Sequence, residues 1–211
     1  MTATETPPRV RPCPIPVDEF DASVRERSEA LTLPPECYTS PAFWEFEKDS
    51  IFFREWLCLG RTDQVPAPGD YFTITIANEP LIVVRDQSGE VNVMSAVCRH
   101  RGTVIAEGAG NCGHAFRCPY HWWTYDLRGK LIGAPAMEPG PCFDKESIQL
   151  PRLEVELWNG FVFANFDEDA LPLAPRLAKI DALLTNFHLE NLVTAVPDVH
   201  DEVPFNWKIM M

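Results

Sequence analysis

The chain has 211 residues, a formal net charge of −13, and 45% hydrophobic residues. This length allows one sizeable domain with extensions, and the acidic charge argues against a nucleic-acid partner because phosphate binding needs a basic surface. No run of eighteen apolar residues predicts a membrane span, and residues 1–6 lack the features of a secretory signal, so we expect a cytoplasmic protein with no membrane partner.

The N-terminal part predicts an arm followed by one helix. Residues 1–39 hold seven of the twenty prolines and show little periodicity, which predicts an irregular arm. Ser40 and Pro41 are typical of a helix start, as N-cap and first helical residue. We therefore expect a helix over residues 40–56, with an aromatic face that packs against the domain.

Residues 57–167 predict short antiparallel strands. Three pairs of apolar runs flank the turn signals Asn78-Glu79, Arg128-Gly129 and Asn159-Gly160, and each pair predicts a hairpin. The fold class predicted here is mainly β, with binding residues on loops between the strands. Residues 168–211 then predict a linker, a helix over residues 175–187 and a strand near residues 192–196.

Two short motifs lie on loops of this β region. Cys98-Arg99-His100 and Cys118-Pro119-Tyr120-His121 form the pattern C-x-H-x17-C-x2-H. Two thiolates and two imidazoles at this spacing suit a Rieske [2Fe-2S] cluster, with both cysteines on one iron and both histidines on the other. We therefore predict Cys98, His100, Cys118 and His121 as the metal ligands.

Two alternatives to this ligand set remain at this point. Structural zinc sites usually pair Cys with Cys and His with His, whereas each motif here is mixed. Cys112 lies between the motifs and is a further thiol candidate, but Cys118 has the better spacing. A disulfide framework among the remaining cysteines is not expected in a reducing compartment.

The two predicted histidine ligands affect the reduction potential. A cluster with two ferric ions, two sulfides and two thiolates carries no net charge, whereas a cluster with four thiolates is negative. An electron enters the neutral cluster more readily, so the imidazoles raise its potential. Gly102 permits the positive φ that a tight ligand loop often needs, and Pro119 stiffens the second motif.

The segments from Cys98 to Gly102 and from Cys118 to Leu131 resemble the α-subunits of Rieske non-haem iron oxygenases. This family includes aromatic-ring-hydroxylating dioxygenases and oxygenases that act on quaternary amines. The resemblance extends from about Ser40 to the C-terminus, where Asn206-Trp207-Lys208 matches a tripeptide that leads into the family's catalytic domain. It implies a Rieske domain with an N-terminal helical arm and a C-terminal extension into a missing α+β catalytic domain.

The resemblance also implies partners and a second iron. Family members receive electrons from NAD(P)H through a flavin reductase, sometimes with a ferredoxin, and pass them to a mononuclear Fe(II) that hydroxylates a small-molecule substrate. That iron is usually held by Asp-x2-His-x4-His, which His114, His188 and His200 do not form. We therefore expect an N-terminal fragment of a mono- or dioxygenase without catalytic residues of its own. The full-length protein is expected to be a homotrimer, or a heterohexamer with a β-subunit.

Three further residues are candidates for positions around the cluster. Arg99 and Arg101 flank His100 and either steer an acidic neighbour or are solvated loop charges. Tyr125 either donates its hydroxyl to a cluster sulfur or is a buried core residue.

The sequence departs from related Rieske proteins in the same loops. Respiratory-type Rieske proteins carry a disulfide between the loops, where this chain has Thr103 and Tyr120, so we predict a potential toward the low end of the Rieske range. Trp122 replaces the family's usual glycine and either shields His121 from water or forces a different turn. The proline-rich stretch 133–141 resembles a loop that covers the cluster, or is an ordinary surface connection.

A second function from another class is a stand-alone electron carrier of the Rieske ferredoxin type. Such a carrier needs neither the aromatic helix before the domain nor the extension after Asp167. The sequence leaves open the substrate, mono- versus dioxygenation and the identity of the redox partner.

Overall fold

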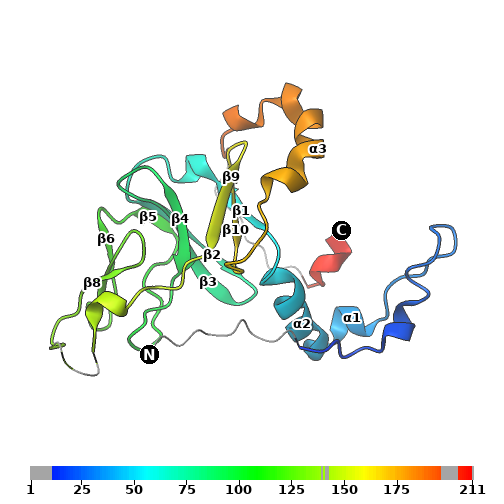
Figure 1. The fold of residues 1–211 in the computed structure, drawn as a ribbon, viewed down its shortest axis with the longest axis horizontal. Coiled ribbons are helices and arrows are strands. Elements are labelled where there is room, and N and C mark those ends of the chain that lie inside the picture. Colours follow the sequence, from blue (N-terminus) through cyan, green and yellow to red (C-terminus); the bar gives the residue numbers. More distant parts are fainter. Residues whose placement is uncertain (1–10, 139, 141–142, 196–203, 211) are drawn as a thin grey trace. The chain divides into compact units, whose positions relative to one another are not determined.

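The computed structural model describes residues 11–138, 140, 143–195 and 204–210, and divides the chain into two units. The β unit is Glu55–Val196, and the arm unit combines Met1–Arg54 with Pro197–Met211. Figure 1 shows the strands of the β unit together with its helix α3 (Ala174–Leu184). In the described part of the chain, no helix is long and apolar enough to cross a bilayer.

Three antiparallel sheets form the β unit, which confirms the predicted mainly β class. The first sheet has the order β1-β10-β9, the second β4-β3-β2-β5 and the third β6-β7-β8. Their bounds are β1 Leu57–Arg61, β2 Asp70–Ile76, β3 Glu79–Arg85, β4 Val91–Ser95, β5 Ala109–Asn111, β6 Ala115–Arg117, β7 Thr124–Asp126, β8 Leu131–Gly133, β9 Glu154–Trp158 and β10 Phe161–Asn165.

The three predicted hairpins are present, although the first turns at Ala77-Asn78 and not at Asn78-Glu79. Ala77 and Asn78 join β2 to β3 with φ values of 51° and 72°, and Asn159 and Gly160 join β9 to β10 with 47° and 84°. Two consecutive positive φ values give the turn whose twist matches paired antiparallel strands. The hairpin of β7 and β8 turns at Gly129, which also has a positive φ of 83°.

Two hydrophobic clusters fill the β unit. One lies between the first sheet and the second, and includes Val65, Val83, Val93 and Val162. The other joins the second sheet to the third, and includes Ile82, Met94, Phe116, Tyr125 and Leu150. Burial of these apolar side chains supplies the main driving force for the fold. The second cluster also contains Cys98 and Cys118, so the predicted thiol ligands are part of a rigid core.

The arm unit contains α1 (Glu36–Thr39) and α2 (Pro41–Glu47). The Ser40 side chain accepts a hydrogen bond from the Phe43 amide, and Pro41 is the first helical residue, as predicted. The predicted helix over residues 40–56 continues after α2 as a π-helical turn over Lys48–Phe52, and it is wrong for residues 53–56, which are not helical. The Ser50 hydroxyl donates to the Phe46 carbonyl at 2.6 Å, and this local bond competes with the regular helical pattern.

A buried ion pair holds the C-terminal tail within the arm unit. Lys208 Nζ lies 2.7 Å from Glu47 Oε1, and both side chains are almost fully buried. The ammonium group also lies over the rings of Tyr38, Phe43 and Trp207, at 5.1–5.6 Å from their centroids. Desolvated cation–π contacts of this kind help to offset the cost of burying the charge. The tripeptide Asn206-Trp207-Lys208 is therefore packed against the helices of the arm.

The extension after β10 differs from the sequence prediction near its end. Helix α3 is present, and a 3-10 turn over Thr185–Phe187 follows it. Residues 192–195 form no strand, and Val196 lies outside the described residues. Side chains bind the backbone there instead, since Arg61 Nη2 donates to the Leu192 carbonyl and the Thr194 amide donates to Asp63. A strand would need the same backbone groups for a ladder.

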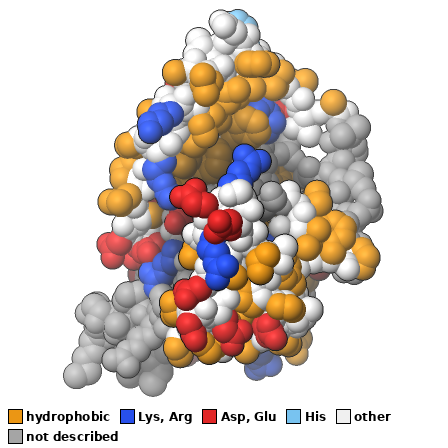
Figure 2. All heavy atoms as spheres, turned by 90° about the vertical axis from the view of Figure 1, so that its right-hand side faces the viewer, with side chains coloured by type: hydrophobic (Ala, Val, Ile, Leu, Met, Phe, Trp, Pro, Cys, Tyr) orange, Lys and Arg blue, Asp and Glu red, His pale blue; other side chains and the backbone are white. Residues whose placement is uncertain are grey.

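Helix α3 keeps much of its apolar face exposed. Leu183 of α3 is 77% exposed, Phe187 of the following 3-10 turn is 66% exposed, and no residue of α3 is buried. Figure 2 shows hydrophobic side chains gathered at the top of the view, where α3 and the turns after it lie. The helix is held mainly at its first residues, where Arg176 pairs with Glu55, and by Asp181, which accepts from the indole of Trp158.

Candidate metal centre

The first motif lies on a short loop after β4, which we call loop 1 (Cys98–Thr103). The Cys98 amide donates to the Thr103 carbonyl at 2.8 Å, and the Gly102 amide donates to the Cys98 carbonyl at 3.0 Å. Gly102 has a φ of 74°, so the chain reverses through a left-handed residue. A bridge between Val97 and Val104 closes the base of the loop.

The second motif lies between β6 and β7 on a loop with the same backbone pattern, which we call loop 2 (Cys118–Trp123). The Cys118 amide donates to the Trp123 carbonyl at 2.8 Å, and the Trp122 amide donates to the Cys118 carbonyl at 3.0 Å. Trp122 has a φ of 61° and therefore takes the position that Gly102 takes in loop 1. Both loops thus reverse at the fourth residue after their cysteine.

The structure contradicts one of the two predicted roles of Trp122, which was a change of turn. Trp122 is 62% exposed, so most of it faces solvent. The turn is the same as in loop 1, so the bulky residue has not forced another one. It instead adopts a left-handed conformation that costs a non-glycine residue roughly 1–2 kcal/mol.

The two loops bring their histidines together. The ring centroids of His100 and His121 lie 4.6 Å apart, with the ring planes at 77°. The Nδ1 atom of each ring is buried and has no hydrogen-bond partner. Two buried imidazole nitrogens without partners are rare in a stable fold, and they fit a pair of metal ligands.

Neighbouring aromatic rings hold these imidazoles in place. The ring of Trp123 is stacked on His100 at 4.7 Å, and the ring of Tyr120 lies 3.9 Å from that of His121. Burial lowers the pKa of His100, and the nearby His121 and Arg101 lower it further. A neutral imidazole is the form that binds a metal.

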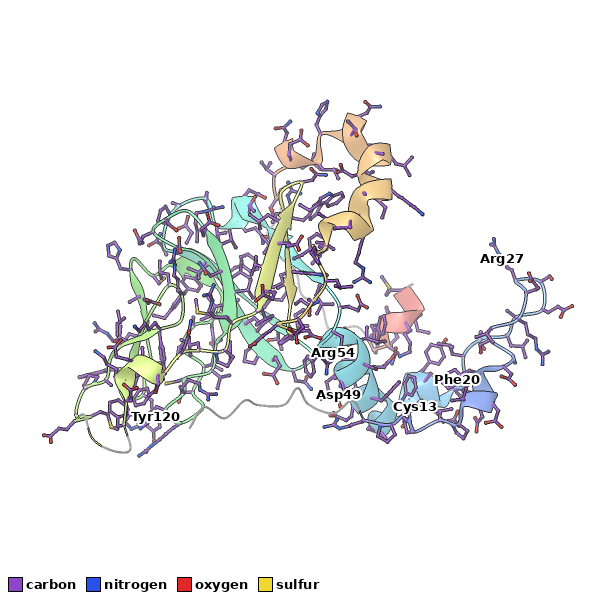
Figure 3. All side chains as sticks on the ribbon, in the orientation of Figure 1. Cys13, Phe20, Arg27, Asp49, Arg54 and Tyr120 are labelled. Atoms are coloured by element: carbon purple, nitrogen blue, oxygen red, sulfur yellow. The ribbon has the colours of Figure 1, made fainter. Side chains whose placement is uncertain are left out.

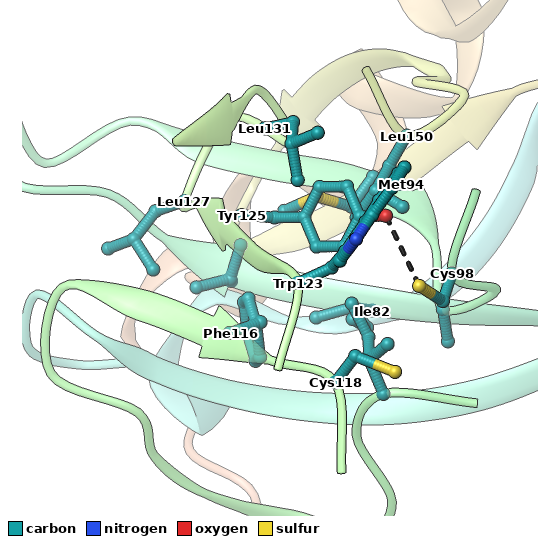
Figure 4. Close-up of a cluster of buried hydrophobic side chains, with 13 residues drawn as sticks. Ile82, Met94, Cys98, Phe116, Cys118, Trp123, Tyr125, Leu127, Leu131 and Leu150 are labelled. Carbon is teal, nitrogen blue, oxygen red and sulfur yellow. Dashed lines mark hydrogen bonds between the residues drawn. The ribbon is translucent and has the colours of Figure 1, made fainter. Parts of the chain in front are cut away.

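The two thiols lie deeper than the imidazoles. Cys98 and Cys118 are both buried within the hydrophobic cluster drawn in Figure 4. No three His, Cys, Asp or Glu side chains among the described residues converge enough to hold a single metal ion. A two-iron cluster has a different requirement, because each iron takes only two protein ligands. Two thiols on one side and two unpartnered imidazoles on the other fit this requirement.

Both loops lie within a segment that matches a known family of domains. Residues 55–151 match the family model of the Rieske [2Fe-2S] domain. The chain carries a Rieske domain and matches the N-terminal part of Rieske oxygenase α-subunits. It is 35% identical to the α-subunit of biphenyl 2,3-dioxygenase from Rhodococcus jostii (strain RHA1), over 89% of this chain and 42% of that protein.

Relatives that act on other compounds are similarly close. The oxygenase subunit of carnitine monooxygenase from Acinetobacter pittii (strain PHEA-2) is 33% identical, over 86% of this chain and 49% of that protein. The crystal structure of the quaternary ammonium Rieske monooxygenase CntA with γ-butyrobetaine has a TM-score of 0.81 at 32% identity, over 93% of this chain and 56% of that one. The chain therefore spans about half the length of the relatives it matches.

Tyr125 of the Rieske domain was predicted to be either a buried core residue or a hydrogen-bond partner of a cluster sulfur. It is a core residue, and its hydroxyl also lies close to a cysteine sulfur. Its side chain is fully buried, and its hydroxyl lies 3.2 Å from Cys98 Sγ (Figure 4). The same oxygen accepts a hydrogen bond from the Arg99 amide at 3.1 Å. Burial raises the pKa of Tyr125, and the hydrogen bond to Cys98 raises it further, so the hydroxyl stays protonated. Against a thiolate, it can only donate.

The two arginines contribute differently from each other. Arg99 supplies its backbone amide to Tyr125, and the side chains of Arg99 and Arg101 are both exposed. The charge of Arg101 acts on His100, whose pKa it helps to lower. Cys112 has a different role from the two cysteines of the loops. Its thiol donates a hydrogen bond to the Gly69 carbonyl at 3.3 Å, and burial raises its pKa to about 11.

A carboxylate that the sequence reasoning missed anchors the strand after loop 2. Asp86 is buried and accepts hydrogen bonds from the amides of Ser88 and Glu90 and from the Ser88 hydroxyl. Arg128, in the turn of the β7–β8 hairpin, donates to it at 2.7 Å. Burial would raise the pKa of Asp86, but these hydrogen bonds outweigh it and hold the pKa well below its usual range. The Asp-Gln-Ser-Gly turn was the available signal, because aspartate often binds the backbone of its own turn.

Proposed function

We propose that Cys98 and Cys118 hold one iron of a Rieske [2Fe-2S] cluster and that His100 and His121 hold the other. The single observation that carries this assignment is the pair of buried Nδ1 atoms without partners, held beside two buried thiols by loops of matching backbone geometry. When bound, such a cluster accepts and releases one electron at a time. The residues of the chain fix its position and exclude water from its sulfur side.

We propose further that the chain relays electrons within an oxygenase. The donor is an NAD(P)H-dependent flavin reductase, with or without a ferredoxin, and the acceptor is a mononuclear Fe(II) site that hydroxylates a substrate. Similarity to α-subunits over 83–89% of the chain supports this assignment over a stand-alone carrier, because it includes the arm and the extension after β10. By the same similarity we propose a cytoplasmic trimeric assembly, with or without a β-subunit.

The substrate class stays open between two groups. The relatives named above include one that oxidises biphenyl and one that oxidises carnitine, at nearly equal identity. The α3 face and the tail of the arm unit do not distinguish between them. We therefore propose an aromatic compound or another small organic molecule as the substrate.

Metal analysis of the anaerobically purified chain tests the assignment of the cluster. We expect two iron atoms and two acid-labile sulfides per chain, with negligible zinc. Zinc at one atom per chain without sulfide would contradict the proposal and favour the structural alternative.

To test the relay, the loaded chain is mixed with NADH and a flavin reductase of this enzyme class. Bleaching of the visible absorption that requires both supports the relay, and no bleaching while dithionite still reduces the chain would contradict it.

A further inference from the structure

The arm unit contains two free cysteines that the proposed cluster does not use, Cys13 and Cys37. Cys37 lies in α1 and is 2% exposed, whereas Cys13 is half-buried. Both are part of the hydrophobic cluster of this unit, whose other buried members are Ile15 and Phe43. Figure 3 labels Cys13 beside α1. The arm therefore leaves this cluster near Cys13 and returns to it at Cys37.

Contacts on both sides of Cys13 fix its position. Two residues before it, Arg11 forms ion pairs with Glu45 of α2 and with Asp49 of the π-helical turn. Two residues after it, Ile15 is 6% exposed and packs in the hydrophobic cluster. An exposed ion pair contributes little by itself, but here it acts together with a buried side chain. The segment 11–15 is thus held against the helices that carry Cys37.

The surroundings of the two thiols differ. Burial raises the pKa of the Cys37 thiol, and the ammonium group of Lys208 opposes this rise. A negative charge on Cys13 raises the same pKa further, so the two sulfurs are close enough to interact electrostatically. A buried thiol of raised pKa reacts slowly with a dissolved oxidant. It can still attack a disulfide that has already formed on its neighbour, and a cation beside it stabilises the attacking thiolate.

We propose that Cys13 and Cys37 form a reversible disulfide when the chain meets a small disulfide of the glutathione type. Cys13 is the more exposed thiol, so its thiolate attacks the oxidant, displaces one glutathione thiolate and forms a mixed disulfide. The Cys37 thiolate then attacks the Cys13 sulfur and displaces the second glutathione. The two cysteines lose two electrons and two protons, and one oxidised glutathione becomes two reduced ones.

This disulfide links the start of the arm to α1 covalently. Without it, the arm is held by a small hydrophobic cluster and by the exposed ion pairs of Arg11. A bond that closes the loop of residues 13–37 restricts the unfolded arm and therefore stabilises the folded one. In a reducing compartment such bonds are transient and serve redox sensing. The inference does not rest on the proposed function, because the arm unit contains none of the proposed ligands.

Peptide mapping tests the bond directly. The folded, cluster-loaded chain is equilibrated with oxidised glutathione, alkylated and digested with trypsin without reduction. Trypsin cuts after Arg25 and Arg27, which are exposed and lie between the two cysteines, so Cys13 and Cys37 end on the separate peptides 10–25 and 28–48. We expect mass spectrometry to find these peptides joined at roughly tenfold higher yield than any other cysteine pair, because the fold holds them together.

Substitutions test the order of the two steps. Cys37→Ser, or Cys37→Ala if serine disturbs the buried position, should stop at the mixed disulfide on Cys13. Cys13→Ser should give neither the link nor a mixed disulfide on Cys37. Cys58→Ser is the matched control, because Cys58 is an exposed cysteine of the β unit, and it should leave the yield unchanged.

Three results would overturn the proposal. They are the absence of the joined peptides in wild type, an equal yield in the urea-unfolded chain, and a link between Cys13 residues of two chains. Hydrogen exchange then measures the effect of the bond on the arm. The amides of residues 36–47 should exchange about tenfold more slowly in the oxidised chain, and dithiothreitol should reverse this change. Exchange rates that are the same before and after oxidation would contradict the stabilisation of the arm.

Discussion

Loop 1 and loop 2 close with the same two backbone hydrogen bonds, but they differ in what surrounds the shared backbone. The sulfur of loop 1 lies 3.2 Å from the Tyr125 hydroxyl, and the loop reverses through a glycine. Loop 2 reverses through a strained tryptophan and presents two rings to solvent. The comparison teaches that the backbone of the loops provides the ligand geometry, while the side chains around it are free to set different properties.

The largest effect is expected when the cysteine of either loop is replaced. Cys98→Ser or Cys118→Ser should abolish cluster binding, because an alkoxide is a far poorer ligand for iron than a thiolate. Iron and acid-labile sulfide should fall close to zero in both variants. Cys112→Ser is the matched control and should keep both at wild-type levels, since its thiol binds the Gly69 carbonyl. Loss of iron in the Cys112 variant alone would show that the ligand was misassigned.

The next largest effect tests whether the two histidines are ligands of the cluster. His100→Cys or His121→Cys should lower the midpoint potential by roughly 100 mV or more, because a thiolate adds negative charge to the cluster. Redox titration followed by visible absorption measures the shift. An unchanged potential in a variant that still holds two irons would contradict the role of imidazole as a ligand.

A smaller effect concerns the buried Asp86 and its partner Arg128. Asp86→Asn should lower the free energy of unfolding by about 2 kcal/mol at neutral pH, because the buried carboxylate loses charged hydrogen bonds. The folded-state pKa of Asp86 lies below its unfolded value, so this stability is present above about pH 4 and is lost as the pH falls through the folded-state pKa.

Urea denaturation of wild type and variant between pH 3 and pH 7 checks this dependence. The difference in unfolding free energy should shrink as the pH falls. Asp169→Asn, at an exposed position, should show almost no difference at any pH. A difference for Asp86→Asn that grows toward low pH would mean that the carboxylate is protonated in the folded chain.

Tyr125→Phe tests the contact between the Tyr125 hydroxyl and the Cys98 sulfur of loop 1. The potential should fall by roughly tens of millivolts, because hydrogen bonds to the sulfurs stabilise the reduced cluster. The free energy of unfolding should fall by about 1 kcal/mol, since the Arg99 amide loses its acceptor. Tyr71→Phe, in the same hydrophobic cluster, is the control whose potential should not move. Equal potentials for the two variants would show that the hydroxyl does not act on the cluster.

The smallest effect compares the two reversal positions directly. Trp122→Gly should raise the free energy of unfolding by about 1 kcal/mol, and Gly102→Ala should lower it by about as much, because only glycine is unstrained at positive φ. No atom lies within 4 Å of the Cβ that alanine would add at Gly102, so the effect measures backbone strain and not a clash. Thermal unfolding of both variants gives the two signs. A less stable Trp122→Gly chain would mean that the ring contributes packing.

Much of the β unit followed from local sequence rules. Turn pairs such as Asn159-Gly160 fixed the hairpins because their backbone preferences are local. The ligand motifs were equally local, since each places its donors within four residues. Tyr125 was a candidate for the same reason, because its place on the strand after loop 2 points it toward the cluster.

Features that depend on distant residues were beyond these rules. Asp86 and Arg128 are 42 residues apart, and Glu47 and Lys208 are 161 apart, so no spacing pattern links them. The equivalence of Trp122 and Gly102 was also hidden, because tryptophan is not a residue that predicts a left-handed turn. The prediction of a strand near residues 192–196 was wrong because the side chains of Arg61 and Asp63 bind the backbone groups that a strand would need.

One measurement tests most directly whether the two loops hold a single cluster with unlike ligands on its two irons. The chain is purified without oxygen, reduced with dithionite and cooled for electron paramagnetic resonance. We predict a rhombic signal with the low average g value of a [2Fe-2S] centre ligated by nitrogen on one iron. A folded chain that gives no signal, or gives the signal of a centre with four cysteine ligands, would contradict the account.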